Sequence, residues 1–263
     1  MSNDRTEDEK LRSFAREYIT LSGEYDNEYE REKMIRDWVR KPAIAANVVQ
    51  DFARRAGDPS GKKILDLGYG NGLYAAAFAR AGAHVDGLEV SESLATIAKK
   101  ICADQGLTVN LQLYDGKVFP YADAMFDYAY SISVIEHVTN PALFLSEIAR
   151  VLKPGGACYI TFPNRYAPRE THTGVYFLGY LPRALAARVM NGLYSRNTVE
   201  EINLHFLSFF SFMRLLKRSG AKLTLLYETD SASALNGLLK RILKFFGIHQ
   251  GALLGHTMLV LRK

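Results

Sequence analysis

The sequence predicts an α/β protein built on a doubly wound, mostly parallel sheet of seven strands. From Lys62 onwards, short apolar runs typical of buried strands alternate with segments of helical periodicity. The first run, Lys63–Leu67, leads into a loop with Gly68, Gly70 and Gly72 at alternate positions, and a helical pattern follows at once. Glycines at this spacing let the backbone turn tightly and let a ligand approach it closely. A ligand site is therefore expected where the first strand ends.

The seven expected strands are separated by helical patterns along most of the chain. The strands are Lys63–Leu67, His84–Glu89, Val109–Tyr114, Phe126–Ile132, Ala157–Phe162, Lys222–Glu228 and His256–Leu261. The helices among them are Leu73–Ala81, Ser91–Gln105, Ala142–Val151, Phe209–Ser219 and Ala234–Phe246. Ser91 has the side chain and the position of an N-cap.

Residues 1–56 are predicted to form an N-terminal helical cap, and residues 57–263 one elaborated α/β domain. The cap contains the helical patterns Glu7–Thr20, Glu28–Arg40 and Ala43–Arg55, and Pro42 is expected to interrupt the last two. Residues 163–205 are expected to form an aromatic insertion after the fifth strand, and residues 234–247 an amphipathic helix. The aromatic residues of the cap are candidates for a lid or for ordinary packing: Tyr18, Tyr25, Tyr29 and Trp38.

The composition is that of an ordinary globular chain. No apolar run reaches the roughly 18–20 residues that span a bilayer, and the acidic segment Met1–Lys10 lacks the features of a signal peptide. The two cysteines, Cys102 and Cys158, lie far apart and have no metal-ligand spacing. We therefore expect a cytoplasmic protein with reduced thiols and no bound metal. The sequence does not distinguish a monomer from a homodimer.

The net charge of +5 is unevenly distributed. Residues 1–160 carry 19 Lys and Arg against 23 Asp and Glu, whereas residues 161–263 carry 14 against 5. The helix expected at residues 234–247 places Leu, Ile and Phe on one side and Lys240, Arg241 and Lys244 on the other. That pattern fits a surface helix packed on the domain or a peripheral contact with a membrane. Nucleic acid is not an expected partner, because no nucleic-acid-binding motif is present.

The glycine loop is compatible with two kinds of cofactor. A dinucleotide fold would have a third glycine at the position of Leu73, so the loop departs from that pattern. Glu89 closes the second strand, where its two carboxylate oxygens can accept both ribose hydroxyls of either cofactor. Asp115 and Gly116 follow the third strand, where an acid can accept from an adenine amino group.

Two further motifs favour one of these cofactors. Tyr130-Ser-Ile-Ser-Val-Ile-Glu-His-Val138 is followed by Ala149-Arg-Val-Leu-Lys-Pro-Gly-Gly156. With the glycine loop, these motifs resemble the class I S-adenosylmethionine-dependent methyltransferases over residues 62–163, in particular the small-molecule group typified by quinone-biosynthesis methyltransferases. The resemblance implies a Rossmann-like methyltransferase fold with S-adenosylmethionine as cofactor and S-adenosylhomocysteine as product.

The resemblance also implies roles for individual residues. Asp66 and the three loop glycines would hold the methionyl part of the cofactor, and Glu89 would bind the ribose diol. Val90 would pack on the adenine, Asp115 and Gly116 would contact its edge, and Ser131 to Ser133 would line the sulfonium end. Tyr69 departs from the small residue usual between the first two glycines, so its ring is expected to cover the cofactor or to reach the substrate.

Methyl transfer to a hydroxyl needs an aligned nucleophile and benefits from a base with a pKa near neutral, for which histidine is suited. His137 follows the fourth strand, and it is a candidate base or a structural residue of the turn. The insertion adds Glu170, which could raise the basicity of His172, and it returns with His205. The candidate substrate-binding residues are Arg165, Tyr166, Arg169 and Tyr176.

The expected activity is methylation of a small-molecule, lipid-linked or saccharide acceptor, most simply at oxygen. The stretch from Pro163 to Gly174 resembles a bacterial methyltransferase subgroup associated with saccharide or lipid-linked products. Transfer to nitrogen or carbon, a non-catalytic cofactor-binding protein and a nicotinamide oxidoreductase are the alternatives. The last disagrees with Leu73 and with the motifs after the fourth strand.

Overall fold

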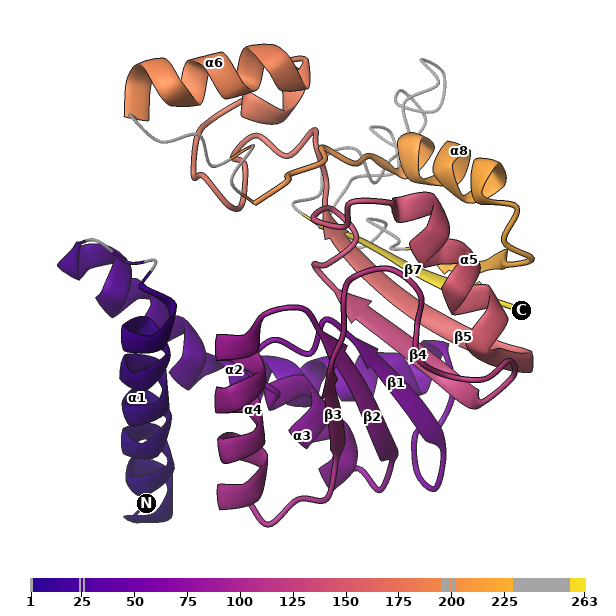
Figure 1. Ribbon diagram of the computed structural model, residues 1–263, viewed down its shortest axis with the longest axis horizontal. Helices are drawn as coiled ribbons and strands as arrows, with labels where there is room; N and C mark the ends of the chain where they lie inside the picture. The colour runs from indigo at the N-terminus through magenta and orange to yellow at the C-terminus, as the bar shows by residue number, and fades with distance from the viewer. Residues whose placement is uncertain (1, 24, 26, 195–198, 200–201, 229–255) are drawn as a thin grey trace, which may run out of the picture. The chain divides into compact units, whose positions relative to one another are not determined.

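The computed structural model describes residues 2–23, 25, 27–194, 199, 202–228 and 256–263. Its strands form a seven-stranded sheet in the order β3-β2-β1-β4-β5-β7-β6, which is drawn with its helices in Figure 1. The chain divides into two compact units. Residues 1–120 and 125–130 form the first unit, and residues 121–124 and 131–263 form the second.

The first unit contains the parallel half of the sheet. Its strands are β1 (Lys63–Leu67), β2 (His84–Glu89), β3 (Asn110–Leu113) and most of β4 (Phe126–Ile132). The β1–β2, β1–β4 and β2–β3 pairs are all parallel. Helices α3 (Leu73–Arg80) and α4 (Glu92–Asp104) connect these strands, and Ser91 caps α4 as expected. The carboxyl ends of β1 and β2 therefore lie at one edge of the sheet.

The N-terminal region forms two helices, α1 (Ser2–Ser22) and α2 (Glu28–Arg55). The prediction that Pro42 ends a helix was wrong, because α2 is continuous through it. The buried residues of α2, Ile35, Trp38, Ala45 and Phe52, share one face on both sides of the proline. Tertiary packing along that face outweighs the single backbone hydrogen bond that proline removes.

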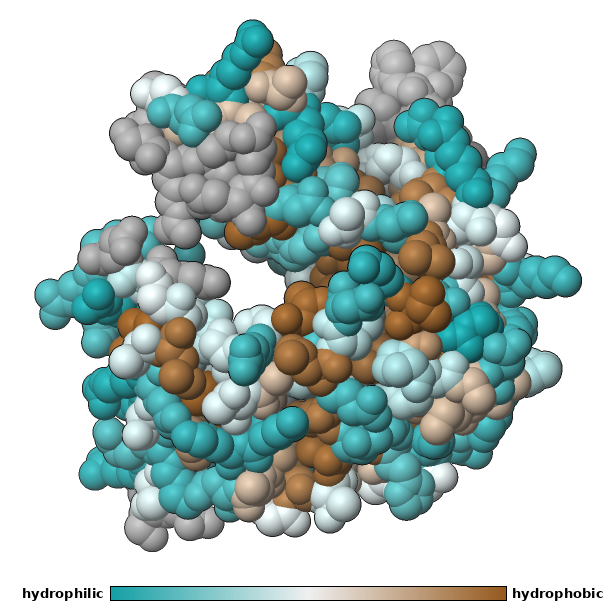
Figure 2. All heavy atoms as spheres, viewed as in Figure 1, coloured by the Kyte–Doolittle hydropathy of each residue, from teal (hydrophilic) through white to brown (hydrophobic). Residues whose placement is uncertain are grey.

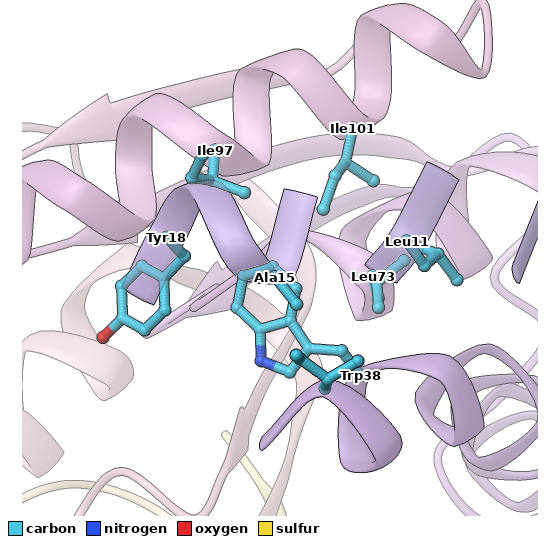
Figure 3. Close-up of a cluster of buried hydrophobic side chains, with 8 residues drawn as sticks. Leu11, Ala15, Tyr18, Trp38, Leu73, Ile97 and Ile101 are labelled. Atoms are coloured by element: carbon cyan, nitrogen blue, oxygen red, sulfur yellow. The ribbon is translucent and has the colours of Figure 1, made fainter. Parts of the chain in front are cut away.

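Helix α1 belongs to the helical layer of the first unit (Figure 3). Tyr18 stacks on Trp38, with ring centroids 5.4 Å apart, and both are buried in a cluster with Ile97 and Ile101 of α4. Ion pairs such as Lys10–Asp104 lie along its margin, and hydrophilic side chains cover the outer side of α1 (Figure 2). Tyr18 and Trp38 are thus core residues, and of the candidate lid aromatics it is Tyr29 that is strongly exposed.

The second unit contains the antiparallel part of the sheet. Its elements are α5 (Pro141–Val151), β5 (Leu152–Pro163), the 3-10 turn η1 (Leu178–Tyr180), α6 (Arg183–Tyr194), α8 (Phe209–Ser219), β6 (Thr224–Glu228) and β7 (His256–Arg262). Strand β7 pairs antiparallel with both β5 and β6. Strand β5 begins earlier than its apolar run because Lys263 forms backbone hydrogen bonds with Gly155 and Gly156.

The insertion after β5 has a small core of its own. Buried side chains of η1 and α6 pack with those of Val199 and Leu204. The amphipathic helix expected at residues 234–247 lies outside the described residues. Among the helices that are described, none has the length and apolar character needed to cross a membrane.

Candidate cofactor site and histidine cluster

The loop after β1 combines a tight turn with one open position. Gly68, Gly70 and Gly72 all have positive φ, at 75°, 53° and 78°. A Cβ on Gly72 would meet the Cβ of Ala98 at 2.9 Å, so this glycine allows α3 to pack against α4. A Cβ on Gly70 would have no neighbour within 4 Å. Gly70 is therefore the loop glycine that leaves space for a ligand.

The Glu89 carboxylate holds this loop in place. Its Oε2 accepts a hydrogen bond of 2.9 Å from the Gly70 amide, and its Oε1 accepts from the amides of Val90 and Ser91 at 2.8 and 3.0 Å. A carboxylate offers about four acceptor positions. Three are already in use, so Glu89 has about one position left for a ribose hydroxyl while the Gly70 bond is made.

Asp66 lies at the end of β1 in a buried polar contact. The Tyr130 hydroxyl donates to its Oδ2 at 2.6 Å, and the Tyr130 ring stacks on Phe78 with centroids 4.2 Å apart. Burial raises the pKa of Asp66 to about 8, against the opposing effects of the Tyr130 hydrogen bond and of Lys41. The carboxyl is therefore poised near neutrality between its charged and its neutral form.

Lys41 is a site residue that the sequence analysis missed. It lies in α2, its ammonium is 5.3 Å from the centre of the Tyr74 ring, and it interacts electrostatically with Asp66 and Glu89. Burial lowers its pKa, and the nearby acids partly offset this shift. No local pattern marks this lysine, since the acids that it faces come from β1 and β2.

The residue after Glu89 offers an apolar surface. Val90 is 59% exposed, and a Cβ on Gly116 would lie 3.4 Å from its side chain. Gly116 has a φ of 77°, and the neighbouring Asp115 accepts from the Lys117 amide at 3.0 Å. An exposed valine beside a glycine, next to an acid, is compatible with the adenine contacts that the sequence predicts.

The Tyr69 side chain is buried, whereas the sequence led us to expect a ring that covers the cofactor or reaches the substrate. It is 1% exposed, and a Cβ on Gly87 would lie 2.7 Å from its ring, so the ring packs inward on β2. This position accounts for the large residue between the first two glycines, since Gly87 makes room for it. The neighbouring Asn71 is also buried, and its Nδ2 has no partner among the described residues.

In the second unit, a short turn follows β4. Ser131 is buried, and its hydroxyl has no hydrogen-bond partner within the described part of the chain. Ser133 has a φ of 55°, a left-handed conformation that is uncommon for serine, and its amide donates to the Thr161 carbonyl. Glu136 and His137 come next, and Asn140 caps α5.

Two histidines from distant parts of the sequence meet beside this turn. The Nε2 atoms of His137 and His172 are 3.1 Å apart. His172 Nδ1 lies 2.9 Å from Glu170 Oε1, so the expected Glu170–His172 pair is present. The other Glu170 oxygen accepts from the amide and the hydroxyl of Thr173, at 2.6 and 2.8 Å. We call Glu136, His137, Glu170 and His172 the histidine cluster.

The pKa values of the two carboxylates of the cluster are shifted in opposite directions. Burial alone would raise the pKa of Glu170, but the hydrogen bonds from His172 and Thr173 lower it to about 2. Burial raises the pKa of Glu136 to about 7, against the opposing effects of the local backbone and of His172. Burial, together with His172, lowers the pKa of His137 to about 4. His137 is therefore neutral at physiological pH.

The end of the insertion fixes the turn that carries the cluster. His137 Nδ1 lies 2.8 Å from the Ile202 carbonyl oxygen, and Asn203 donates to the His137 carbonyl at 3.1 Å. The His205 amide donates to the Glu136 carbonyl at 2.7 Å, and burial lowers the pKa of the His205 ring. His205 thus positions Glu136 through the backbone. Its ring contributes to lowering the pKa of His137, and its Nε2 is buried with no hydrogen-bond partner among the described residues.

The candidate substrate residues form a compact loop. Arg165 Nε donates to the Gly179 carbonyl at 2.9 Å, and Arg169 Nε donates to the Gly174 carbonyl at the same distance. These contacts use part of each guanidinium to hold the loop, and the predicted role of both arginines in substrate binding stays a prediction. Tyr166 lies under Arg165, and Tyr176, which is 65% exposed, lies under Arg169. An exposed aromatic surface therefore belongs to the insertion.

Comparison with known proteins agrees with the motifs. Residues 65–160 match a family model described as a methyltransferase domain. The resemblance expected from the sequence is confirmed. The ubiquinone biosynthesis O-methyltransferase of Coxiella burnetii (strain Dugway 5J108-111) is 34% identical over 126 residues, which are 47% of this chain and 54% of the relative. That of Parvibaculum lavamentivorans is 35% identical over 46% of this chain and 49% of the relative. The chain thus spans about half the length of these curated relatives.

Solved structures show the same fold. An S-adenosylmethionine-dependent methyltransferase from Mesorhizobium loti has a TM-score of 0.56 and 17% identity, over 82% of this chain and 96% of that one. The cyclase SpnF has the same TM-score and 21% identity, over 83% and 80% of the two chains. This chain has the class I methyltransferase fold. Because one neighbour is named a cyclase, the fold by itself does not identify the reaction.

Proposed function

We propose that this protein transfers the methyl group of S-adenosylmethionine to a hydroxyl of a small, lipid-like or saccharide acceptor. The observation that carries the proposal is the pairing of His137 with His172, and of His172 with Glu170. A histidine oriented by a carboxylate is suited to accept the proton of a hydroxyl. Transfer to oxygen needs such a proton acceptor, and the curated relatives similar to about half of this chain are named O-methyltransferases.

The first unit would hold the cofactor. The residues present fit it, since Gly70 leaves open space, Glu89 retains one acceptor position and Val90 offers an exposed apolar face. Lys41 places a cation beside Asp66 and Glu89, so the site can accept the carboxylate as well as the ammonium of an amino acid. When bound, S-adenosylmethionine supplies an electrophilic methyl group, and the protein aligns the nucleophile and excludes water.

The second unit would bind the acceptor. In this proposal, His172 takes the hydroxyl proton at Nε2, and Glu170 stabilises the resulting imidazolium through its hydrogen bond to Nδ1. The exposed rings of Tyr176, Phe177 and Tyr180 favour an acceptor with an apolar or ring-shaped part. This preference agrees with a quinone precursor or a lipid-linked saccharide.

The test has two stages. Calorimetry should show micromolar binding of S-adenosylhomocysteine and no binding of NAD. Methyl-labelled S-adenosylmethionine should then be incubated with phenols, lipid-linked saccharides and matched amines, and the labelled products should be identified. Label on oxygen supports the proposal. Label only on nitrogen or carbon contradicts O-methylation, and binding without turnover on any acceptor indicates a non-catalytic protein.

A further inference from the structure

We propose that Glu136, His137 and His172 form a binding site for one divalent transition-metal ion. The site is assembled in the second unit from the turn after β4 and from the insertion, which contributes His172. Within the described residues, these three side chains are grouped so that their ligand atoms all lie within 4.8 Å of one another. Neither the cysteines nor any local spacing predicts this site, because two of its ligands are 35 residues apart.

The hydrogen bonds fix which nitrogen of each histidine is free. His137 Nδ1 faces the Ile202 carbonyl and His172 Nδ1 faces the Glu170 carboxylate, and both of these oxygens accept hydrogen bonds. Each Nδ1 therefore carries its proton, and a neutral ring then has its lone pair on Nε2. The two Nε2 atoms, 3.1 Å apart, thus direct lone pairs toward the same place. Such an arrangement needs a proton or a metal ion between them.

Glu136 supplies the third ligand atom and the strongest reason for an ion. Its side chain is 1% exposed, and neither carboxylate oxygen has a hydrogen-bond partner among the described residues. Buried carboxylates are normally paired or bound to a metal. Glu136 Oε1 lies 3.9 Å from the Nε2 of His137 and 3.9 Å from that of His172, so its oxygen is equally far from both nitrogens.

The three distances leave room for an ion of a particular size. With edges of 3.1, 3.9 and 3.9 Å, the triangle of ligand atoms has a point that is equidistant from all three. This point lies about 2.1 Å from each atom, which is the usual bond length of zinc to imidazole nitrogen or to carboxylate oxygen. The observed geometry therefore needs little rearrangement to bind an ion.

The surroundings of the ligands have the pattern found around metal sites. A metal-bound histidine usually donates its second N–H to a carboxylate or a backbone carbonyl, which fixes the ring orientation. His172 does so to Glu170, and His137 does so to Ile202. Two imidazoles and one carboxylate favour Zn²⁺, Fe²⁺, Co²⁺ or Ni²⁺ over Mg²⁺ or Ca²⁺. Three protein ligands also leave an open coordination position, as in catalytic zinc sites.

The open coordination position suggests that the ion acts in methyl transfer, and only this part of the inference rests on the proposed function. A hydroxyl bound to a divalent ion loses its proton more readily than a free hydroxyl. The ion would then lower the pKa of the acceptor hydroxyl, whose proton would pass to water. With the ion bound, His172 would be a ligand, and it would be the base only in the metal-free site. The existence of the site does not depend on methyl transfer.

The test measures metal binding directly. Tag-free full-length protein is treated with a chelator, exchanged into metal-free buffer and titrated with Zn²⁺ by calorimetry, and Co²⁺ is added in parallel to follow its visible absorption. We expect one ion per chain and the absorption spectrum of Co²⁺ with nitrogen and oxygen ligands. Glu136→Gln and His172→Gln should each weaken Zn²⁺ binding by at least about tenfold, and Glu170→Gln by about tenfold through the second N–H of His172.

His84→Gln is the matched control, because it makes the same change at an exposed histidine of the first unit. It should leave Zn²⁺ binding unchanged. Circular dichroism and binding of S-adenosylhomocysteine show whether each variant is folded. The proposal is overturned if the wild type binds no ion, which would leave a shared proton between the histidines, or if the cluster variants bind as tightly as the wild type. Methyl transfer by metal-free protein at the full rate would overturn the role of the ion alone.

Discussion

The cofactor loop and the histidine cluster are built in opposite ways. The loop, Gly68–Gly72, is shaped by the backbone of consecutive residues, and one carboxylate, Glu89, holds it through amide hydrogen bonds. The cluster is made of side chains that come from two separate segments, and the end of the insertion fixes it through Ile202. A backbone site is encoded in local sequence, whereas a side-chain cluster depends on which segments the fold brings together.

The largest effect is expected at the open loop glycine. Gly70→Val should weaken S-adenosylhomocysteine binding by more than about 100-fold, because the new side chain enters the space left for the ligand. The strain of a left-handed backbone lowers the free energy of unfolding by only about 1–2 kcal/mol, so the variant should still fold. The measurement is calorimetric titration. Gly106→Val is the matched control, since Gly106 has a φ of 64° and open space but lies before β3. Equal affinities of the two variants would disprove the role of Gly70.

The next effect tests the cluster. His172→Ala should lower the rate of methyl transfer by about 10²–10⁴-fold, since it removes the group that accepts or induces loss of the acceptor proton. Binding of S-adenosylhomocysteine should change by less than about twofold, a range that routine calorimetry distinguishes. His84→Ala serves as the control in both assays. A variant with normal turnover would reduce His172 to a structural residue of the insertion.

A smaller effect is expected at Lys41, whose side chain faces the two acids beside the cofactor loop. Lys41→Met should weaken S-adenosylhomocysteine binding by about tenfold, because it removes the cation that faces the two acids of the site and would face the carboxylate of the ligand. Lys33→Met changes an exposed lysine of the same helix, and it should have no effect. If the two variants bind equally well, Lys41 does not contact the ligand.

The smallest effect concerns the stability of the ligand-free protein. The pKa of Asp66 is raised from 3.8 to about 8 by burial, so the folded chain holds this proton more tightly than the unfolded chain. Folding stability from this carboxyl is therefore lost as the pH rises from about 4 to 8. Asp66→Asn removes this pH-dependent loss of folding stability. The substitution should therefore raise the Tm by about 2–4 °C at pH 8 and by less at pH 5. Thermal scans at both values check this, and a lower Tm for the variant at pH 8 would contradict it.

The difference between backbone and side-chain sites also explains which predictions succeeded. Strands His84–Glu89 and Phe126–Ile132 and helix Phe209–Ser219 have the bounds expected from their patterns, because their apolar residues and caps are local signals. The prediction at Pro42 was wrong, since the buried face that keeps α2 continuous is formed by tertiary packing. Substrate binding by Arg165 stays a prediction, since carbonyls of its own loop accept hydrogen bonds from only part of its guanidinium.

The residues that the sequence did not single out share one property. Lys41 and Glu136 become informative only through the groups that they face, two acids for the lysine and two imidazoles for the glutamate. Glu136 lies within the Glu-His-Val motif, but its lack of a hydrogen-bond partner can be recognised only in the folded chain. Such residues can be identified only once the structure is known.

The most direct test of the proposed activity is calorimetric titration of the wild-type protein with S-adenosylhomocysteine, with NAD as the control. Micromolar binding of S-adenosylhomocysteine alone is the expected result, and it would show that the loop and Glu89 hold the methyl-donor cofactor. Binding of NAD alone, or of neither ligand, would contradict the proposal that this chain is an S-adenosylmethionine-dependent methyltransferase.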